Sequence, residues 1–339
     1  MHVFVTGATG FVGFHTVMAL IKAGHTVRLG VRSPEKMRKL YAAHGVDISD
    51  FAVGEITDAE AIDKALENCD AVVHTAAMVS LDANKEAIMR HTNLTGTKLV
   101  VGGAVKKGIK SIVYVSSVAA LYDRHAKVLN ENMPLVEPQS AYMRSKRECE
   151  DYVRQLIDDG ASIAITYPSA VIGPNDPAMS EGNQGLAFIL KLCFVNTTTG
   201  QQIIDVRELA NAHVKLLEQK KSGRFLVTGH YVPWRELGLK LDKVMGKTMI
   251  KLTLPRWLLR LTGVIVDLIG KVHKLDIPIT REAVTFATEW VYADDSKIRE
   301  ALNITYRPVE DTLRDTVKWL VDEGHAPAKW AENIKDAEV

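Results

Sequence analysis

A glycine-rich turn close to the N-terminus constrains this chain more than any other feature. It reads Thr6-Gly7-Ala8-Thr9-Gly10-Phe11-Val12-Gly13 and lies between a strand-like run and a helical pattern. Gly7 permits a tight turn, Gly10 lets a ligand approach the backbone, and Gly13 permits close packing of helix on strand. The helix start offers free N–H groups and a partial positive charge to phosphates. The segment therefore predicts a dinucleotide-binding loop, whose ligand-facing residues are Gly7, Thr9, Gly10, Phe11 and Val12.

Short apolar strands alternate with helical patterns over the first half of the chain. We expect strands at 3–5, 27–31, 51–53, 71–74, 112–115 and 162–166, and helices at 11–23, 59–67, 85–106 and 141–156. This alternation indicates a parallel sheet that helices cover on both faces. The predicted fold class is therefore α/β, with a doubly wound parallel sheet of the Rossmann type.

The alternation is lost after Pro168, where prolines and glycines mark loops, including a long one over 176–196. A helix at 206–219, a strand at 224–228 and several C-terminal helices are expected to follow. We predict a dinucleotide-binding domain over 1–168 and a smaller C-terminal α/β lobe over 169–339. The segment 200–228 could return to the first domain. The lobe would bind substrate over the carboxyl ends of the strands.

Bulk composition excludes several classes of partner. The 339 residues carry a formal net charge of only +1, which gives no support to binding of nucleic acid or an anionic membrane. The three cysteines lie far apart, which favours a reducing compartment and predicts neither a disulfide framework nor a metal site. No signal-peptide pattern opens the chain, and the apolar stretch 257–269 is broken by Arg260 and Asp267. We expect a cytoplasmic, metal-independent protein without stable membrane insertion.

The end of the second predicted strand indicates which dinucleotide is bound. An NAD site places an acidic residue there, whereas this chain has Val31-Arg32-Ser33. Arg32 offers a planar, permanently charged group to a 2′-phosphate, and Lys36 follows nearby. The sequence favours NADP(H) on these grounds, with NAD(H) left open. The alternative is that Arg32 is only a solvated surface residue.

Tyr142 and Lys146 stand one helical turn apart on the same predicted helix face. A free phenol has a pKa of about 10, and a neighbouring ammonium favours the phenolate and brings that pKa toward the working range. Ser117, at the end of the strand 112–115, could hold a substrate oxygen as charge develops there. We predict Ser117, Tyr142 and Lys146 as the catalytic residues of a carbonyl reductase. Ser116 competes for the serine role, and the tyrosine–lysine spacing also occurs by chance.

With these motifs, the chain resembles the extended short-chain dehydrogenase/reductases of the NAD(P)-dependent epimerase/dehydratase superfamily. It most resembles the dihydroflavonol-reductase-like branch, which includes cinnamoyl-CoA reductases and related aldehyde or ketone reductases. The resemblance covers nearly the whole chain. It rests on Thr6–Gly13, His74–Ala77, Asn93–Thr97, Val113–Ser117, Tyr142–Lys146, Pro168–Pro174 and Asp205–Ala210.

The resemblance assigns roles to further residues around the cofactor. Ala76 and Ala77 would line it, Pro168 and Val171 would flank the nicotinamide, Glu55 and Ile56 would lie near the adenine, and Asn93 would support the proton relay. Lys146 would also hydrogen-bond the nicotinamide ribose. Two positions depart from the family pattern, which often has Asp in place of Glu55 and more usually Asn in place of Tyr167. Asn93 could instead only cross-link helices, and His74 and His213 read as structural histidines.

Other functions of the superfamily stay open. Dehydratases of this type carry an acid pair after the catalytic serine, whereas Ser117 is followed by Val118-Ala119-Ala120. Sugar-nucleotide epimerases usually show Asn-x-Tyr-Gly-Pro after the sixth strand, and this chain has Val171-Ile172-Gly173-Pro174 there. Both features favour a reductase over an epimerase or dehydratase. A non-catalytic dinucleotide sensor would typically have lost Tyr142 or Lys146.

The substrate is expected to be an apolar or aromatic carbonyl compound, because the segment 176–196 carries few charges. Its walls would come from Leu121-Tyr122, from 176–196 and from the C-terminal lobe, although core packing explains most of these apolar residues equally well. A 3-beta-hydroxysteroid-type dehydrogenase, with the stretch 257–269 touching a membrane surface, is a weaker alternative. The resemblance also implies a homodimer.

Overall fold

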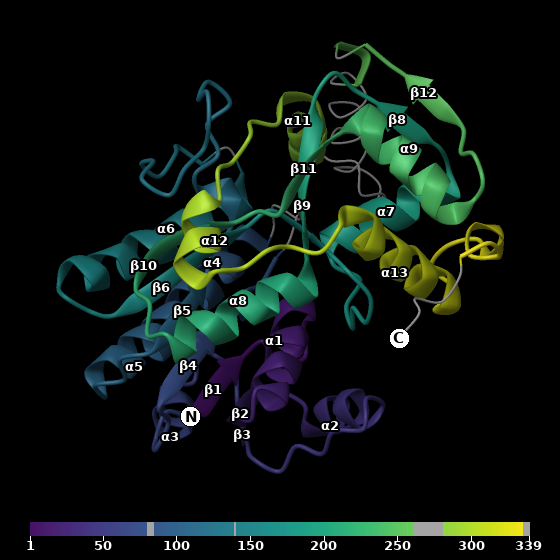
Figure 1. Ribbon diagram of the computed structural model, residues 1–339. Coiled ribbons are helices and arrows are strands. Elements are labelled where there is room, and N and C mark those ends of the chain that lie inside the picture. The colour runs from purple at the N-terminus through teal and green to yellow at the C-terminus, as the bar shows by residue number, and fades with distance from the viewer. Residues whose placement is uncertain (80–84, 139, 256, 260–280, 335–339) are drawn as a thin grey trace.

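The computed structural model describes residues 1–79, 85–138, 140–255, 257–259 and 281–334 (Figure 1). Its centre is a seven-stranded sheet in the order β10-β6-β5-β4-β1-β2-β3, and every neighbouring pair in it is parallel. The strands are β1 (His2–Thr6), β2 (Thr26–Val31), β3 (Phe51–Val53), β4 (Ala71–His74), β5 (Ile112–Val115), β6 (Ile163–Pro168) and β10 (Gly223–Val227). The predicted doubly wound α/β fold is confirmed.

Successive residues of the central strands are buried on opposite faces of this sheet. Val3 and Val5 of β1 belong to one apolar core, whereas Phe4 belongs to another. In the same way Val113 faces the first core, and Ile112 and Tyr114 face the second. Burial on both faces explains why the strands are apolar throughout rather than alternating with polar residues.

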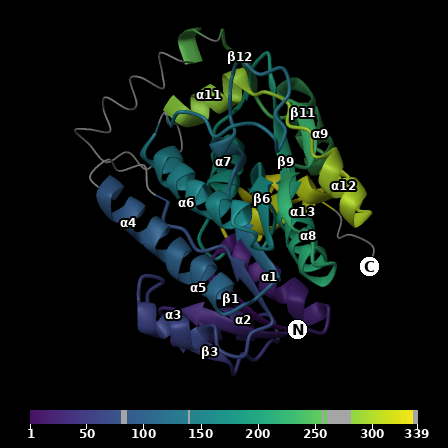
Figure 2. The ribbon, with the colours of Figure 1, turned by 90° about the vertical axis from the view of Figure 1, so that its left-hand side faces the viewer.

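Two layers of helices cover these faces. α1 (Phe11–Lys22) and α8 (Val206–Glu218) pack together on one face, and α4 (Glu86–Thr97) and α6 (Ala141–Asp158) pack together on the other (Figure 2). The long helix expected at 85–106 is present, but it changes pitch. A π-helical segment, η2 (Lys98–Gly102), separates α4 from α5 (Gly103–Lys106). A Cβ at Gly102 would meet the Tyr152 hydroxyl at 2.1 Å, so a larger residue there would have to displace the Tyr152 side chain.

Two short helices complete the first part of the chain. α3 (Ala59–Ala65) begins at Asp58, whose carboxylate accepts hydrogen bonds from the Glu60 and Ala61 amides. α2 (Pro34–Ala42) was not predicted. It begins at Ser33, whose hydroxyl accepts a hydrogen bond from the Lys36 amide, and has proline at its first position. A serine–proline helix start of this kind was the available signal.

The C-terminal part forms a smaller lobe over the carboxyl ends of the main strands (Figure 1). It contains a three-stranded sheet in the order β11-β9-β7 and a two-stranded sheet, β12-β8. Its elements are β7 (Ala170–Ile172), α7 (Glu181–Lys191), β8 (Phe194–Asn196), β9 (Gly200–Asp205), β11 (His230–Pro233), α9 (Trp234–Met245), β12 (Lys251–Thr253), α11 (Arg281–Glu289), α13 (Val309–Asp322) and the 3-10 turn η4 (Ala328–Trp330). A third apolar core, which includes Phe194, Trp234 and Leu313, holds it together.

The two parts interleave along the chain. β10 lies at the edge of the main sheet, and α12 (Ser296–Leu302) packs its Ile298 and Leu302 into the first core. The buried side chain of Gln202 on β9 then holds the segment after α11. It donates to the Ala293 carbonyl and accepts from the Trp290 indole and the Ala293 amide. A division at residue 168 into a cofactor domain and a substrate lobe stays a proposal.

Two expectations about this lobe are corrected or untested. The segment 176–196, predicted as a loop, contains α7 and β8, and Leu186, Leu190 and Phe194 in it belong to the third core. Glycines and a proline early in the segment obscured the helical pattern that follows. Of the stretch 257–269, residues 260–269 lie outside the described residues, and the side chain of Trp257 is exposed.

Candidate functional site

The glycine loop follows β1, which lies between β4 and β2 in the sheet. The strand order reverses at this point, and ligands usually bind at such a reversal in parallel sheets. Gly7 has φ +71°, and a Cβ there would meet the Thr75 hydroxyl at 2.4 Å. A Cβ at Gly13 would lie 2.1 Å from the Gly7 carbonyl oxygen. No side chain caps α1 at Gly10, and its first turn has no acidic residue. The cradle therefore fits a pyrophosphate group, since backbone amides and not side chains face it.

Two residues that sequence reasoning missed support this loop from behind. The Tyr41 hydroxyl on α2 donates a hydrogen bond of 2.8 Å to the Ala8 carbonyl, and the Thr75 hydroxyl donates one of 2.8 Å to the Thr6 carbonyl. Burial raises the pKa of Tyr41, so its phenol stays a neutral donor. The loop is thus fixed from α2 and from the chain after β4.

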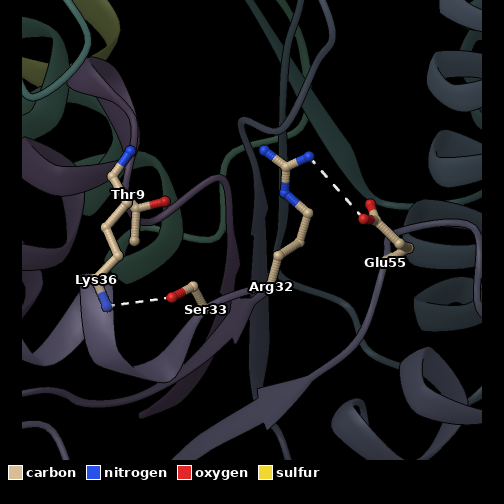
Figure 3. A pocket seen from close by; sticks show the side chains of 5 residues that line it. All are labelled: Thr9, Arg32, Ser33, Lys36 and Glu55. Atoms are coloured by element: carbon tan, nitrogen blue, oxygen red, sulfur yellow. Dashed lines mark hydrogen bonds and ion pairs between the residues drawn. The ribbon is translucent and has the colours of Figure 1, made fainter.

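A recess beside the loop brings together four of the predicted cofactor residues. It is lined by Thr9, Arg32, Ser33, Lys36 and Glu55 (Figure 3). Arg32 follows β2 directly, and its side chain is 78% exposed. Its guanidinium has a carboxylate neighbour, Glu55, at 4.0 Å. Ser33, not predicted as a site residue, completes the wall. The recess offers two cations and two hydroxyl groups, which suits a phosphate group.

A second, shallow recess adjoins the first and is lined in part by Gly30, Val53, Glu55 and Ile56. It lies at the ends of β2 and β3, and Glu55 borders both recesses. Ile56 also packs against α4, where a Cβ at Gly96 would meet its side chain at 2.5 Å. Glu55 thus lies beside Arg32, and Ile56 follows it in the adjoining recess; their predicted place near an adenine ring stays a prediction.

The predicted catalytic helix, α6, begins at Ser140, whose hydroxyl accepts a hydrogen bond from the Met143 amide. Tyr142 and Lys146 follow in its first turns. The side chain of Lys146 points to the end of β5, where its Nζ lies 3.4 Å from the Val115 carbonyl oxygen. Lys146 is only 7% exposed, and burial lowers the pKa of its ammonium, while Glu150 opposes this shift. The residues after Val115 are Ser116 and Ser117, so this contact brings the lysine next to both serines.

The two serines have different environments. Ser116 is buried, and its hydroxyl donates a hydrogen bond of 2.6 Å to the Glu150 carboxylate. Ser117 is partly exposed and begins the short 3-10 turn η3 (Val118–Ala120), where its hydroxyl accepts a bond of 3.2 Å from the Ala119 amide. The Ser117 hydroxyl thus retains its own proton for another acceptor. This difference supports Ser117, not Ser116, as the residue that holds a substrate oxygen.

Asn93 on α4 acts as a clamp. Its Oδ1 accepts from the Met78 amide at 2.7 Å, and its Nδ2 donates to the Met78 carbonyl at 2.9 Å and to the Ser145 hydroxyl at 2.8 Å. Both N–H donors of the amide are therefore used inside the protein. Asn93 holds the segment that carries Ala76 and Ala77 against α6, which favours its cross-linking role over contact with a ligand.

Pro168 ends β6 in the main sheet, and Val171 lies in β7, the next strand along the chain. Val171 pairs with β9, and the nearby Gly173 has φ +153° and approaches the Phe11 ring, with 3.5 Å from an added Cβ. Phe11 opens α1, so Gly173 lies beside the residue that ends the glycine loop. The predicted place of Pro168 and Val171 beside the nicotinamide stays a prediction.

His74 and His213, both buried, are structural. His74 is bonded to the Thr6 hydroxyl at 2.7 Å, and His213 lies between the hydroxyls of Thr16 and Thr166 at 3.0 and 3.2 Å. Burial lowers the pKa of each imidazole to about 3, and for His74 the Lys146 charge adds to this shift. Both are therefore neutral at physiological pH, as expected for packed histidines.

The described residues provide neither a membrane-spanning helix nor a metal site. In the part of the chain that the structure describes, no helix is long and apolar enough to span a bilayer. Among the same residues, no group of three or more His, Cys, Asp or Glu side chains could hold a metal ion.

Comparison with known proteins agrees with this geometry. The model of the NAD dependent epimerase/dehydratase family matches residues 3–229. The chain belongs to this family. As a member, it is an NAD(P)-dependent enzyme acting on carbonyl or hydroxyl groups, and the predicted resemblance to extended short-chain dehydrogenase/reductases is confirmed.

Within the epimerase/dehydratase family, the similar proteins include reductases and epimerases. The chain is 29% identical to a Synechocystis protein that carries the name of a dihydroflavonol 4-reductase, with 95% of each chain covered. It is 25% identical to cinnamoyl-CoA reductase 1 of Petunia hybrida, with 96% of this chain and 93% of the relative covered. The solved structure of UDP-glucose 4-epimerase from Bifidobacterium longum, with NAD+ and UDP, is 18% identical and has a TM-score of 0.72. The match covers 96% of this chain and 100% of the epimerase chain, and at this identity it supports the fold alone.

Proposed function

We propose that this protein is an NADP(H)-dependent reductase of an aldehyde or ketone, with Tyr142 as the proton donor. The observation that carries the proposal is the place of Lys146. Its buried ammonium lies one turn after Tyr142 and 3.4 Å from the Val115 carbonyl, immediately before Ser116 and Ser117. The ammonium therefore lies at the carboxyl end of β5, from which the two serines follow, and Tyr142 stands one helical turn before it on α6. The names of the reductase relatives support the same chemistry.

The preference for NADP(H) follows from the recess at the end of β2. Arg32 and Lys36 reach it from two elements, and the acidic residue that would bind ribose hydroxyls at this position is absent from Val31-Arg32-Ser33. A 2′-phosphate would replace the weak, exposed contact between Arg32 and Glu55 with a charge-assisted pair. Gly7, Thr9, Gly10, Phe11 and Val12 would hold the pyrophosphate.

The residues of the site would then share the work as follows. The bound reduced nicotinamide supplies a hydride to the carbonyl carbon. Tyr142 donates its proton to the carbonyl oxygen, and Ser117 donates a hydrogen bond to the same oxygen. The Lys146 ammonium lowers the pKa of Tyr142 and would hold the nicotinamide ribose. Because Lys146 is buried, its charge acts through a low dielectric and is screened little by solvent.

An apolar or aromatic carbonyl compound is the proposed substrate class. The residues that follow Ser117, Val118-Ala119-Ala120, are buried and apolar, so none of them offers a carboxylate for eliminating water. Leu121 and Tyr122 are core residues, and the Tyr122 hydroxyl donates to the Glu289 carbonyl at 2.6 Å. Both side chains are therefore packed in the core behind the site and would not form an open wall of the substrate pocket. The walls would come from the C-terminal lobe.

An activity panel tests this function against the epimerase alternative, which the family name keeps in view. Aliphatic and aromatic aldehydes and ketones, including ketosteroids, are assayed with NADPH and with NADH, and UDP-sugars are assayed with NADPH, NADH and NAD+. We expect NADPH oxidation with apolar carbonyl compounds and none with UDP-sugars. Turnover of UDP-sugars alone, with NAD+ and without net cofactor oxidation, would contradict the proposal.

A further inference from the structure

Four side chains follow one another at intervals of four residues along α6: Tyr142, Lys146, Glu150 and Arg154. This spacing places them along one face of the helix. Only the first two belong to the proposed reaction. Glu150 is fully buried, which is rare for a carboxylate unless it is hydrogen-bonded and paired.

The Glu150 carboxylate is held by donors from three elements. One oxygen accepts from the Ser116 hydroxyl at 2.6 Å, at the end of β5. The other accepts from the Tyr167 hydroxyl on β6 at 2.5 Å and from the Arg154 guanidinium at 2.6 and 2.9 Å. Arg154 also donates to the Tyr167 hydroxyl at 3.2 Å. Glu150 therefore joins α6 to the two strand ends that precede Ser117 and Pro168.

We propose that Glu150 is a positioning residue. It holds Ser116 and α6, the helix that carries Lys146, in a fixed relative position, and it keeps a negative charge one turn from Lys146. This inference rests on the proposed function, because it assigns Glu150 to the same site. It also gives a physical role to Tyr167, which is one of the two positions where the chain departs from the family pattern. The phenol reaches the carboxylate from β6 and satisfies one of its lone pairs.

The other groups around Lys146 and Glu150 are neutral near physiological pH. Burial lowers the pKa of His74 to about 3 and raises the pKa values of Tyr114, Tyr167 and Cys149. Among the described residues, Glu150 is therefore the fixed charge one turn from Lys146, and Arg154 lies one turn further on, paired with the Glu150 carboxylate. Removing the negative one should make Lys146 and Tyr142 lose their protons at lower pH, and removing the positive one should have the reverse effect.

The test is the pH profile of kcat/KM for carbonyl reduction by NADPH. The reaction requires a protonated Tyr142 and a charged Lys146, so kcat/KM should fall at high pH, and this fall is the alkaline limb of the profile. Glu150→Gln should lower kcat and move that limb to lower pH by about one unit, given a unit charge at helical-turn distance. The matched control is Glu148→Gln, two residues earlier on α6, whose carboxylate is paired with Arg90 at the surface. It should leave the limb in place.

Arg154→Met provides a second test, which holds even if Glu150→Gln does not fold. It leaves the carboxylate with its two hydroxyl donors and should move the limb to higher pH. Shifts of opposite sign in the two variants support the inference. An unmoved limb in a folded variant that still binds NADPH overturns it, whatever happens to kcat, because a purely structural role changes kcat or stability alone. A wild-type protein that reduces no carbonyl compound would instead overturn the proposed function itself.

Discussion

The two ends of the proposed cofactor site handle charge in opposite ways. At the adenosine end, Arg32 is exposed, and its carboxylate neighbour Glu55 lies at 4.0 Å. At the catalytic end, Lys146 is buried and Glu150 is fully desolvated with donors on both oxygens. An exposed cation costs little and can change partners when a phosphate arrives. A buried charge must be compensated when the protein folds, so its geometry exists before any ligand binds.

This difference in burial indicates at which end of the site a charged residue can be replaced without loss of stability. Changes at the adenosine end should alter cofactor choice and leave the fold intact. Changes at the catalytic end should alter the rate of the chemical step, with stability affected where a compensated charge loses its partner. Variants at each end can therefore break or sharpen the comparison.

The largest effect is expected at the catalytic end, for Lys146→Met. Loss of the ammonium leaves Tyr142 a weak acid, so kcat should fall by about 10²- to 10⁴-fold. Methionine fills the space of the buried stem without a charge, so stability should hold or rise. Steady-state kinetics and thermal unfolding measure both, with the exposed Lys106→Met at the end of α5 as control. A Lys146→Met enzyme with wild-type kcat would remove the lysine from the mechanism.

A smaller effect is expected at the adenosine end, for Arg32→Gln. Loss of a charge-assisted contact of about 1.5–3 kcal/mol should reduce the preference for NADPH over NADH by roughly 10- to 100-fold, mainly through KM. Arg38→Gln on α2 is the control, because the Arg38 guanidinium lies over the Phe51 ring and outside the recess. Equal losses with both cofactors would show that the recess does not recognise the 2′-phosphate.

A third effect concerns acid stability, away from both ends. The folded-state pKa of His213 is lowered to about 3, below its ordinary value of 6.5, so protonation favours the unfolded chain. Stability from this group is therefore complete above pH ~6.5 and is lost as pH falls toward 3, by about 1.4 kcal/mol per pH unit.

His213→Gln should remove that contribution to the slope, since the amide can still bond Thr16 and Thr166. Urea unfolding at pH 4.5, 5.5 and 6.5 measures the slope for this variant and for the exposed control His91→Gln. An unchanged slope in His213→Gln would mean that the imidazole is not kept neutral by the fold.

Most of the fold could be predicted from local patterns in the sequence. The apolar strands and the tight turn of the glycine loop each carry a signal within a few residues, and the structure confirms them. α2 was missed because only Met37 and Tyr41 on it are buried, which leaves little periodicity to detect. The π-helical segment Lys98–Gly102 was not predicted, because its residues carry an ordinary helical pattern and its contact with Tyr152 comes from another helix.

The candidate site was predictable where residues act through short spacing, and not where they act through tertiary contacts. Thr9, Arg32, Lys36 and Glu55 come from separate segments, but each follows a strand or starts a helix at one end of the sheet, so their convergence could be expected. Glu150 looks like a solvated helix charge in the sequence. Its buried partners on β5 and β6 appear only when the chain is folded.

The most direct test of the central claim is single-turnover oxidation of NADPH by Tyr142→Phe, with a carbonyl substrate of the wild-type enzyme. The variant lacks only the phenolic oxygen, so its Kd for NADPH should stay within about twofold to threefold, whereas hydride transfer should slow by about 10²- to 10⁴-fold. Hydride transfer at the wild-type rate in a variant that binds NADPH normally would contradict the claim that Tyr142 supplies the proton.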